Sequence, residues 1–221
     1  MLKVYYLKIS DCTTLSEQNL LKRLENAERE VVKKLSNNRI RSQKCLASAM
    51  SRELIERLWQ LRSEDYSIGR AEHGKPYVHG KSAIYYNISH SGDYIVCALS
   101  NREVGVDIQQ MGKEKPLLAE RFFHPNEVLK LNQTSPEDRR ALFFRYWSAK
   151  ESYLKYTGTG LSGSLSGFEI LFNGTTARVK KEGMLEVPAM WALEIHPDYQ
   201  CHLCTDSVET PELYPFHFRE P

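Results

Sequence analysis

The sequence predicts an α+β fold in which one chain contains two similar α/β halves, with the boundary near residue 104. Each half opens with a strand-like alternation of apolar residues, at Val4–Ile9 and at Val104–Ile108, followed by helical patterns and further strands. The segments His90–Leu99 and His196–Leu203 also resemble each other, because both place an Asp-Tyr pair at a turn before a strand. The interface between two such halves is a natural place for a ligand cleft.

The first half is predicted to contain two amphipathic helices and a β-hairpin. Thr14 and Glu17 match a capping box, and the apolar residues that follow recur at helical spacing. The polar turn His90–Asp93 separates two strand-like runs, so Ser89 and His90 are expected at a turn, where side chains reach ligands. The expected elements are helices over residues 14–37 and 39–61 and strands over residues 83–88 and 94–100.

A long helix dominates the predicted second half. Ser135 is a candidate N-cap, Pro136 fits the first helical position, and Gly158 lies where the helix should stop. The tail from Thr210, which contains three prolines, is expected to be loose. The expected elements are helices near residues 117–132 and over 136–156, and strands over 104–108, 168–172, 176–181 and 190–205.

Composition is that of an ordinary globular protein. A chain of 221 residues, 41% hydrophobic, can bury a core in one large domain or two small ones, which we place at residues 1–104 and 105–221. The formal charge of +2 argues against a nucleic-acid binder that acts through a strong overall field. Five dispersed cysteines and the lack of a signal-like or membrane-spanning segment favour a cytoplasmic protein, expected to be a monomer. Cys201 and Cys204 have CxxC spacing, but no second ligand pair follows, so structural thiols are favoured over zinc.

Two segments place charged side chains where chemistry is expected. On a helix, Trp147, Glu151 and Lys155 share one face, which sets a carboxylate next to an ammonium group. On a strand, Asp107 and Gln109 point away from the apolar side of Val104–Ile108. A carboxylate inside an apolar run is costly unless it binds something, so we favour metal ligation by Asp107 over an exposed edge position. For Glu151, the sequence alone favours a simple surface pair with Lys155.

Four segments together resemble the 4'-phosphopantetheinyl transferases of the surfactin-synthetase-activating type. They are Gly74–Pro76, Asn87–Ser91, Val104–Gln109 and Trp147–Lys155, in the order of that family. The resemblance implies a pseudo-dimeric fold and a holo-[acyl-carrier-protein] synthase type of enzyme. Such an enzyme transfers the 4'-phosphopantetheine arm of coenzyme A to a serine of an apo acyl or peptidyl carrier protein and releases adenosine 3',5'-bisphosphate. The pathways implied are fatty-acid, polyketide or nonribosomal peptide biosynthesis.

The resemblance also implies a Mg²⁺ site. Asp107 and Glu151 match the family residues that bind Mg²⁺ together with the pyrophosphate of coenzyme A, which reverses the surface-pair interpretation of Glu151. Gln109 stands where a glutamate is typical and offers only a neutral oxygen, so water or its amide would complete the metal ligands. Glu127 matches another acidic residue of the family site, although a carboxylate at the start of a short helix is equally expected there. Glu151, or a water that it holds, and Glu127 are both candidates for the general base.

Basic and polar side chains are expected to hold coenzyme A. By resemblance, Lys75 and His90 bind phosphates, Ser89 donates a hydrogen bond, and Lys155 faces the pyrophosphate. Glu28 and Val31 stand where the family has basic residues that grip the 3'-phosphate. Lys33, Lys34, Arg41 or Lys44 could substitute for them, and we favour Lys44.

The same residues are compatible with two other functions, and one segment is a candidate docking surface for a carrier protein. A metal-dependent phosphodiesterase could use the same carboxylates, and an inactive carrier-binding homologue would be consistent with Gln109. For a carrier protein, Leu117 and Phe123 are the expected exposed contacts, with Leu118 and Phe122 turned inward at helical spacing.

Overall fold

The structure, a computed structural model, describes residues 1–12, 15–81, 83–113, 116–160 and 164–219. Its helices are α1 (Glu17–Lys22), α2 (Asn26–Lys33), α3 (Asn38–Trp59), α4 (Pro116–Phe122), α5 (Pro125–Gln133) and α6 (Pro136–Thr157). Its strands are β1 (Leu2–Lys8), β2 (Ser67–Arg70), β3 (Pro76–His79), β4 (Tyr85–Ser91), β5 (Tyr94–Ser100), β6 (Val104–Gln110), β7 (Phe168–Asn173), β8 (Thr176–Lys181), β9 (Met184–Ala192), β10 (Tyr199–Thr205) and β11 (Glu212–Pro215).

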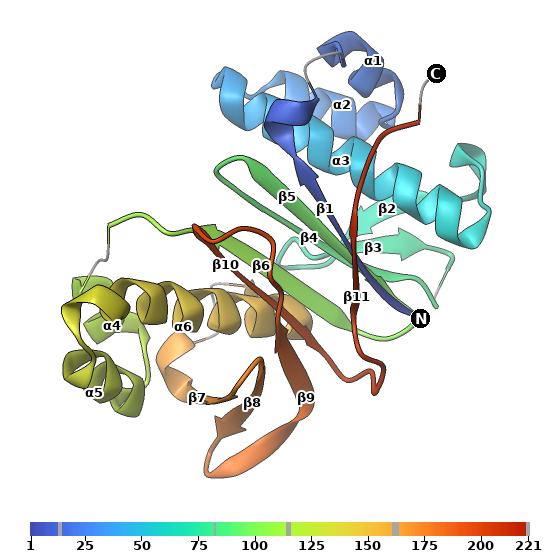
Figure 1. The fold of residues 1–221 in the computed structure, drawn as a ribbon. Helices are drawn as coiled ribbons and strands as arrows, with labels where there is room; N and C mark the ends of the chain where they lie inside the picture. The colour runs from blue at the N-terminus through green and yellow to red at the C-terminus, as the bar shows by residue number, and fades with distance from the viewer. Residues whose placement is uncertain (13–14, 82, 114–115, 161–163, 220–221) are drawn as a thin grey trace.

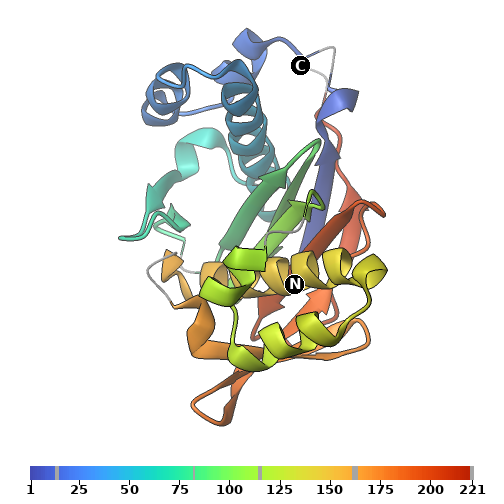
Figure 2. The ribbon, with the colours of Figure 1, turned by 90° about the vertical axis from the view of Figure 1, so that its left-hand side faces the viewer.

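Two sheets carry the two predicted halves. The first has the order β11-β1-β5-β4 and the second the order β6-β10-β9-β8-β7, while β2 and β3 form a separate hairpin. Helices α1–α3 gather at one end of the molecule and α4–α6 at the other, with β4, β5, β6 and β10 between α3 and α6 (Figures 1 and 2). The predicted α+β fold with two halves is confirmed.

The sequence echo marks a real contact between the halves. Tyr94 begins β5 and Tyr199 begins β10, and their rings meet edge to face with centroids 4.9 Å apart. The Tyr199 hydroxyl also accepts a hydrogen bond from the backbone N–H of Asp93 at 3.0 Å. The two Asp-Tyr turns therefore lie side by side.

Both long helices follow from their local sequence. Asn37 caps α3 and Ser135 caps α6, each by accepting a hydrogen bond from a backbone N–H of the first turn. Pro136 begins α6, and Gly158 ends it in the left-handed conformation with φ of 73°. The predictions for these two helices are confirmed. No helix among the described residues is long and apolar enough to cross a membrane.

Several expected elements differ from the structure. The first predicted helix is divided into α1, capped by Ser16, and α2, while Thr14 lies outside the described residues. The stretch near residues 117–132 is likewise divided into α4 and α5, and the last predicted strand into β9 and β10. The tail from Thr210 to residue 219 is not loose as expected but contacts the first half. Its strand β11 pairs with β1 of the first sheet, and Phe216 is buried in the first half.

Candidate active site

The two halves meet where β4 lies against β6. Strand β6 is an edge strand of its sheet, so its outward N–H groups have no strand partner. Side chains at every second position of β4 accept hydrogen bonds from these groups, as the two-residue period of a strand allows. The three bonds run from Val106 N to Asn87 Oδ1 (2.9 Å), Ile108 N to Ser89 Oγ (3.3 Å) and Gln110 N to Ser91 Oγ (2.9 Å). This seam brings Ser89 of one half to Asp107 of the other.

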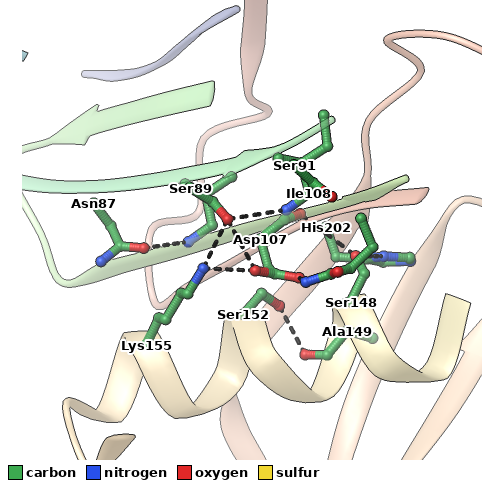
Figure 3. Close-up of polar contacts among 12 residues, drawn as sticks. Asn87, Ser89, Ser91, Asp107, Ile108, Ser148, Ala149, Ser152, Lys155 and His202 are labelled. Atoms are coloured by element: carbon green, nitrogen blue, oxygen red, sulfur yellow. Dashed lines mark hydrogen bonds and ion pairs between the residues drawn. The ribbon is translucent and has the colours of Figure 1, made fainter. Parts of the chain in front are cut away.

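Asp107 is buried and hydrogen-bonded on both oxygens. Ser89 Oγ donates to Oδ1 at 2.9 Å, and Lys155 Nζ lies 2.6 Å from the same oxygen (Figure 3). Gln109 Nε2 donates to Oδ2 at 2.9 Å. The carboxylate is only 2% exposed, so these partners offset the cost of removing its charge from water. The seam, β6 and α6 thus converge on one carboxylate.

Glu151 is the second carboxylate of the site. It lies on α6, lines a cavity, and has no hydrogen-bond or ion-pair partner in the part of the chain that the structure describes. Burial raises the pKa of Glu151, the nearby charge of Asp107 raises it further, and Lys155 lowers it. The two carboxylates repel each other, and a bound cation would offset that repulsion.

The cavity beside Glu151 has a volume of about 430 Å³ and lies between α3, the Gly74 turn, β4 and α6. Its charged lining consists of four cations, Lys44, Arg70, Lys75 and Lys155, and two carboxylates, Glu28 and Glu151. Burial and the charge of Arg70 lower the pKa of Lys44, while the charge of Glu28 raises it, and a bound anion would stabilise the charged form of Lys44. Lys75 Nζ is held by Glu103 at 2.5 Å and by the carbonyl of Tyr156 at 2.7 Å. The wall is therefore suited to a polyanionic ligand.

The structure brings most of the predicted site residues together. Lys44, Lys75, Glu151 and Lys155 line the cavity, while Ser89, Gln109 and Lys155 donate hydrogen bonds to Asp107. His90 lies in β4 and not at a turn, which is also true of Ser89, so that expectation was wrong. Partial desolvation and the charges of Lys44 and Lys155 lower the pKa of His90, while the charge of Asp107 raises it.

The structure does not bring Glu127 into this group. Its carboxylate is buried, lies 2.9 Å from Lys150 Nζ, and accepts hydrogen bonds from the backbone N–H groups of His124 and Ile170. Burial raises its pKa, and Lys150 opposes that shift. Because both of its oxygens are engaged inside the second half, Glu127 is a helix cap and an internal ion-pair partner, and it is not placed to act as the base.

Sequence reasoning missed Arg70 and His73, which both line the cavity. In the β2–β3 hairpin Arg70 pairs with Pro76, which brings it beside Lys75. A signal was present, because a short polar turn between two strands places residues on either side of it next to each other.

Phe123 is buried at 2% exposure in the core of the second half, so it is not an exposed contact, whereas Leu117 is 79% exposed. The described residues contain no group of three or more His, Cys, Asp or Glu side chains placed to hold a metal. All five cysteines are described, and none is paired in a disulfide.

Comparison with known proteins gives consistent matches over both halves. A family model described as the 4'-phosphopantetheinyl transferase superfamily matches residues 103–204, and one described as 4'-phosphopantetheinyl transferase, N-terminal, matches residues 13–102. The chain is 32% identical over 160 residues to the 4'-phosphopantetheinyl transferase gsp of Aneurinibacillus migulanus, covering 72% of this chain and 67% of that protein. It is 30% identical over 178 residues to the 4'-phosphopantetheinyl transferase Sfp of Bacillus subtilis, covering 76% and 75%.

Proposed function

Because the chain belongs to the 4'-phosphopantetheinyl transferase family, it transfers the 4'-phosphopantetheine arm of coenzyme A to a carrier protein, and we propose that the residues around Asp107 carry out this reaction. The observation that supports this assignment is the group of Asp107, Lys155 and Ser89, which joins the two halves beside a cavity lined by cations. The phosphodiesterase and inactive-homologue alternatives gain no support from these relatives.

Coenzyme A would occupy the cationic cavity. The cavity volume of about 430 Å³ lies within the range of small-molecule sites. We assign Lys75 and Lys155 to the pyrophosphate and Lys44, with Arg70, to the 3'-phosphate. His90, on β4, would contribute a further contact to a phosphate. When coenzyme A binds, Lys75 would lose its contact with Glu103 and would contact the pyrophosphate instead.

The carboxylates fit a Mg²⁺ ion. Asp107 and Glu151 supply oxygen ligands, and Glu151 lacks any other partner among the described residues, so an ion would compensate its charge. Gln109 donates a hydrogen bond from its amide nitrogen to Asp107. It therefore stabilises that carboxylate, and its amide oxygen is the only atom with which it could bind the metal. When bound, Mg²⁺ would neutralise charge on the pyrophosphate.

The side chains of the protein would position the reactants and move one proton. Lys155 Nζ, held 2.8 Å from Ser89 Oγ and 2.6 Å from Asp107 Oδ1, is placed to donate a hydrogen bond to the departing bisphosphate. Glu151, whose pKa is raised, is the better placed base for the serine hydroxyl of the carrier, directly or through a water. Phosphoryl transfer needs no nucleophile from the enzyme.

The proposal is tested by incubating the protein with coenzyme A, Mg²⁺ and a panel of apo carrier proteins from fatty-acid, polyketide and peptide synthesis. We expect mass spectrometry to show the arm on a carrier serine with the wild type and not with Asp107→Ala. Hydrolysis of coenzyme A without modification of any carrier would instead support a phosphodiesterase. The dispersed, unpaired cysteines are consistent with a reducing compartment such as the cytoplasm.

A further inference from the structure

Behind Asp107, groups from three elements meet at one buried point. Ser148 Oγ on α6 lies 2.8 Å from His202 Nδ1 on β10 and 3.4 Å from the backbone carbonyl oxygen of Asp107 on β6. His202 and Asp107 are direct partners in the β6–β10 register (Figure 3). Ser148 and His202 are 0% and 1% exposed. The contact between Ser148 and His202 therefore links α6 to β10 next to Asp107.

The His202 ring is buried at a cost. Its Nε2 has no hydrogen-bond partner in the described part of the chain. Burial, with a smaller effect of Arg145, lowers the pKa of His202 to about 3, so the ring is neutral at neutral pH. A buried polar atom without a partner destabilises the folded state and calls for an explanation. An apolar side chain of similar size would avoid that cost, so the ring must contribute something else.

The hydrogen-bonding directions show what the ring contributes. A serine hydroxyl has one proton, and when Ser148 donates it to the Asp107 carbonyl, its other partner must be a donor. The tautomer of His202 with its proton on Nδ1 supplies that donor and holds Ser148 in one orientation.

A second contact fixes α6 on β6 on the far side of Glu151. A Cβ atom at Gly105 would lie 2.2 Å from both the carbonyl oxygen of Ser152 and the nitrogen of Tyr156, so strand and helix backbones touch there. Glu151 lies between this contact and Ser148. Because each helical residue advances by about 1.5 Å and turns by about 100°, a one-residue slip of α6 would both shift Glu151 along the helix axis and turn it relative to Asp107.

We propose that His202 is a positioning residue, which acts through Ser148 to fix Glu151 relative to Asp107 and so sets the geometry of the two carboxylates. This inference rests on the proposed function of that pair. The competing explanation is that His202 only fills space, in which case any side chain of similar shape would serve.

Two variants of matched shape separate these explanations. His202→Asn can keep a donor where Nδ1 lies, and His202→Leu cannot. For His202→Leu we expect roughly a tenfold rise in the Mg²⁺ concentration that gives half-maximal transfer, with an unchanged KM for the carrier. Calorimetric titration of coenzyme A without carrier should show that this variant loses most of the Mg²⁺-dependent part of the affinity. Its Tm should equal or exceed that of the wild type, because the unpaired Nε2 is removed. His202→Asn should stay within about threefold of the wild type in both assays.

Equal Mg²⁺ requirements for His202→Leu and the wild type, or equal impairment of both variants, would overturn the proposal. If His202→Leu does not fold, Ser148→Ala removes the same link with a smaller change and should raise the Mg²⁺ requirement likewise. A wild type that transfers nothing to any carrier would count against the proposed function alone, and the calorimetric comparison would still decide this inference.

Discussion

Ser89 of the first half donates a hydrogen bond of 2.9 Å to Asp107 of the second half, so the central carboxylate of the site is held by both halves. The same serine oxygen receives the N–H of Ile108 and the ammonium group of Lys155. This arrangement is possible because β6 is an edge strand of its sheet. If β4 and β6 paired directly in a continuous sheet, no side chain would lie between their backbones. The interface is therefore itself part of the proposed catalytic site.

Glu151→Gln should abolish transfer and stabilise the unliganded protein. The variant loses a metal ligand and the candidate base, which we expect to lower the rate by roughly 100-fold or more. It also removes a desolvated carboxylate that has no partner among the described residues, so Tm without Mg²⁺ and coenzyme A should rise. Near-normal turnover, or a fall in Tm, would show that Glu151 is not an unpaired ligand.

Gln109→Glu should strengthen the binding of Mg²⁺. It replaces a hydrogen bond to Asp107 with a third carboxylate, which repels Asp107 until a cation binds. We expect the half-maximal Mg²⁺ concentration to fall severalfold, and Tm without Mg²⁺ to fall as well. Gln200→Glu, at the partner position on β10, is the matched control. An unchanged or higher requirement would place Gln109 away from the metal.

Lys44→Met should weaken the binding of coenzyme A more than that of dephospho-coenzyme A, which lacks the 3'-phosphate. Losing one charged contact corresponds to roughly 10- to 100-fold in KM. Lys33→Met is the control, because Lys33 is exposed and paired with Glu30. The same loss for both ligands would mean that Lys44 contacts another part of the molecule.

Leu117→Ala should raise the KM for the carrier protein and leave the KM for coenzyme A unchanged. Leu117 follows β6 on α4 and is 79% exposed, and contact with a partner would bury it. Leu129→Ala on α5, also an exposed leucine, is the control. If Leu129→Ala has the larger effect on the carrier, the docking surface lies on α5.

Stability should depend on pH through His202. The folded pKa of about 3 lies below the ordinary value of 6.5, so the neutral ring contributes stability above about pH 6.5 that is lost as pH falls toward 3. Over that window, the wild type should lose about 1.4 kcal/mol per pH unit relative to His202→Leu. Urea unfolding of both proteins at several pH values measures this difference. A difference that does not vary with pH would contradict a buried neutral ring.

The sequence predicted those parts of the site that local patterns determine. The caps of α6 and the alternation of β6 placed Glu151, Lys155 and Asp107 correctly on their elements. Glu127 could not be placed, because its ion pair with Lys150 depends on how α5 packs against α6. Phe123 was misplaced because α4 ends at Phe122, which interrupts the helical period.

The stoichiometry of the reaction tests the central claim most directly. Wild-type protein, coenzyme A, Mg²⁺ and an apo carrier should yield holo carrier and adenosine 3',5'-bisphosphate in equal amounts, as measured in the same samples by mass spectrometry and chromatography. Asp107→Ala should yield neither product. Release of the bisphosphate without an equal amount of holo carrier, or full activity of Asp107→Ala, would contradict transfer at the Asp107 site.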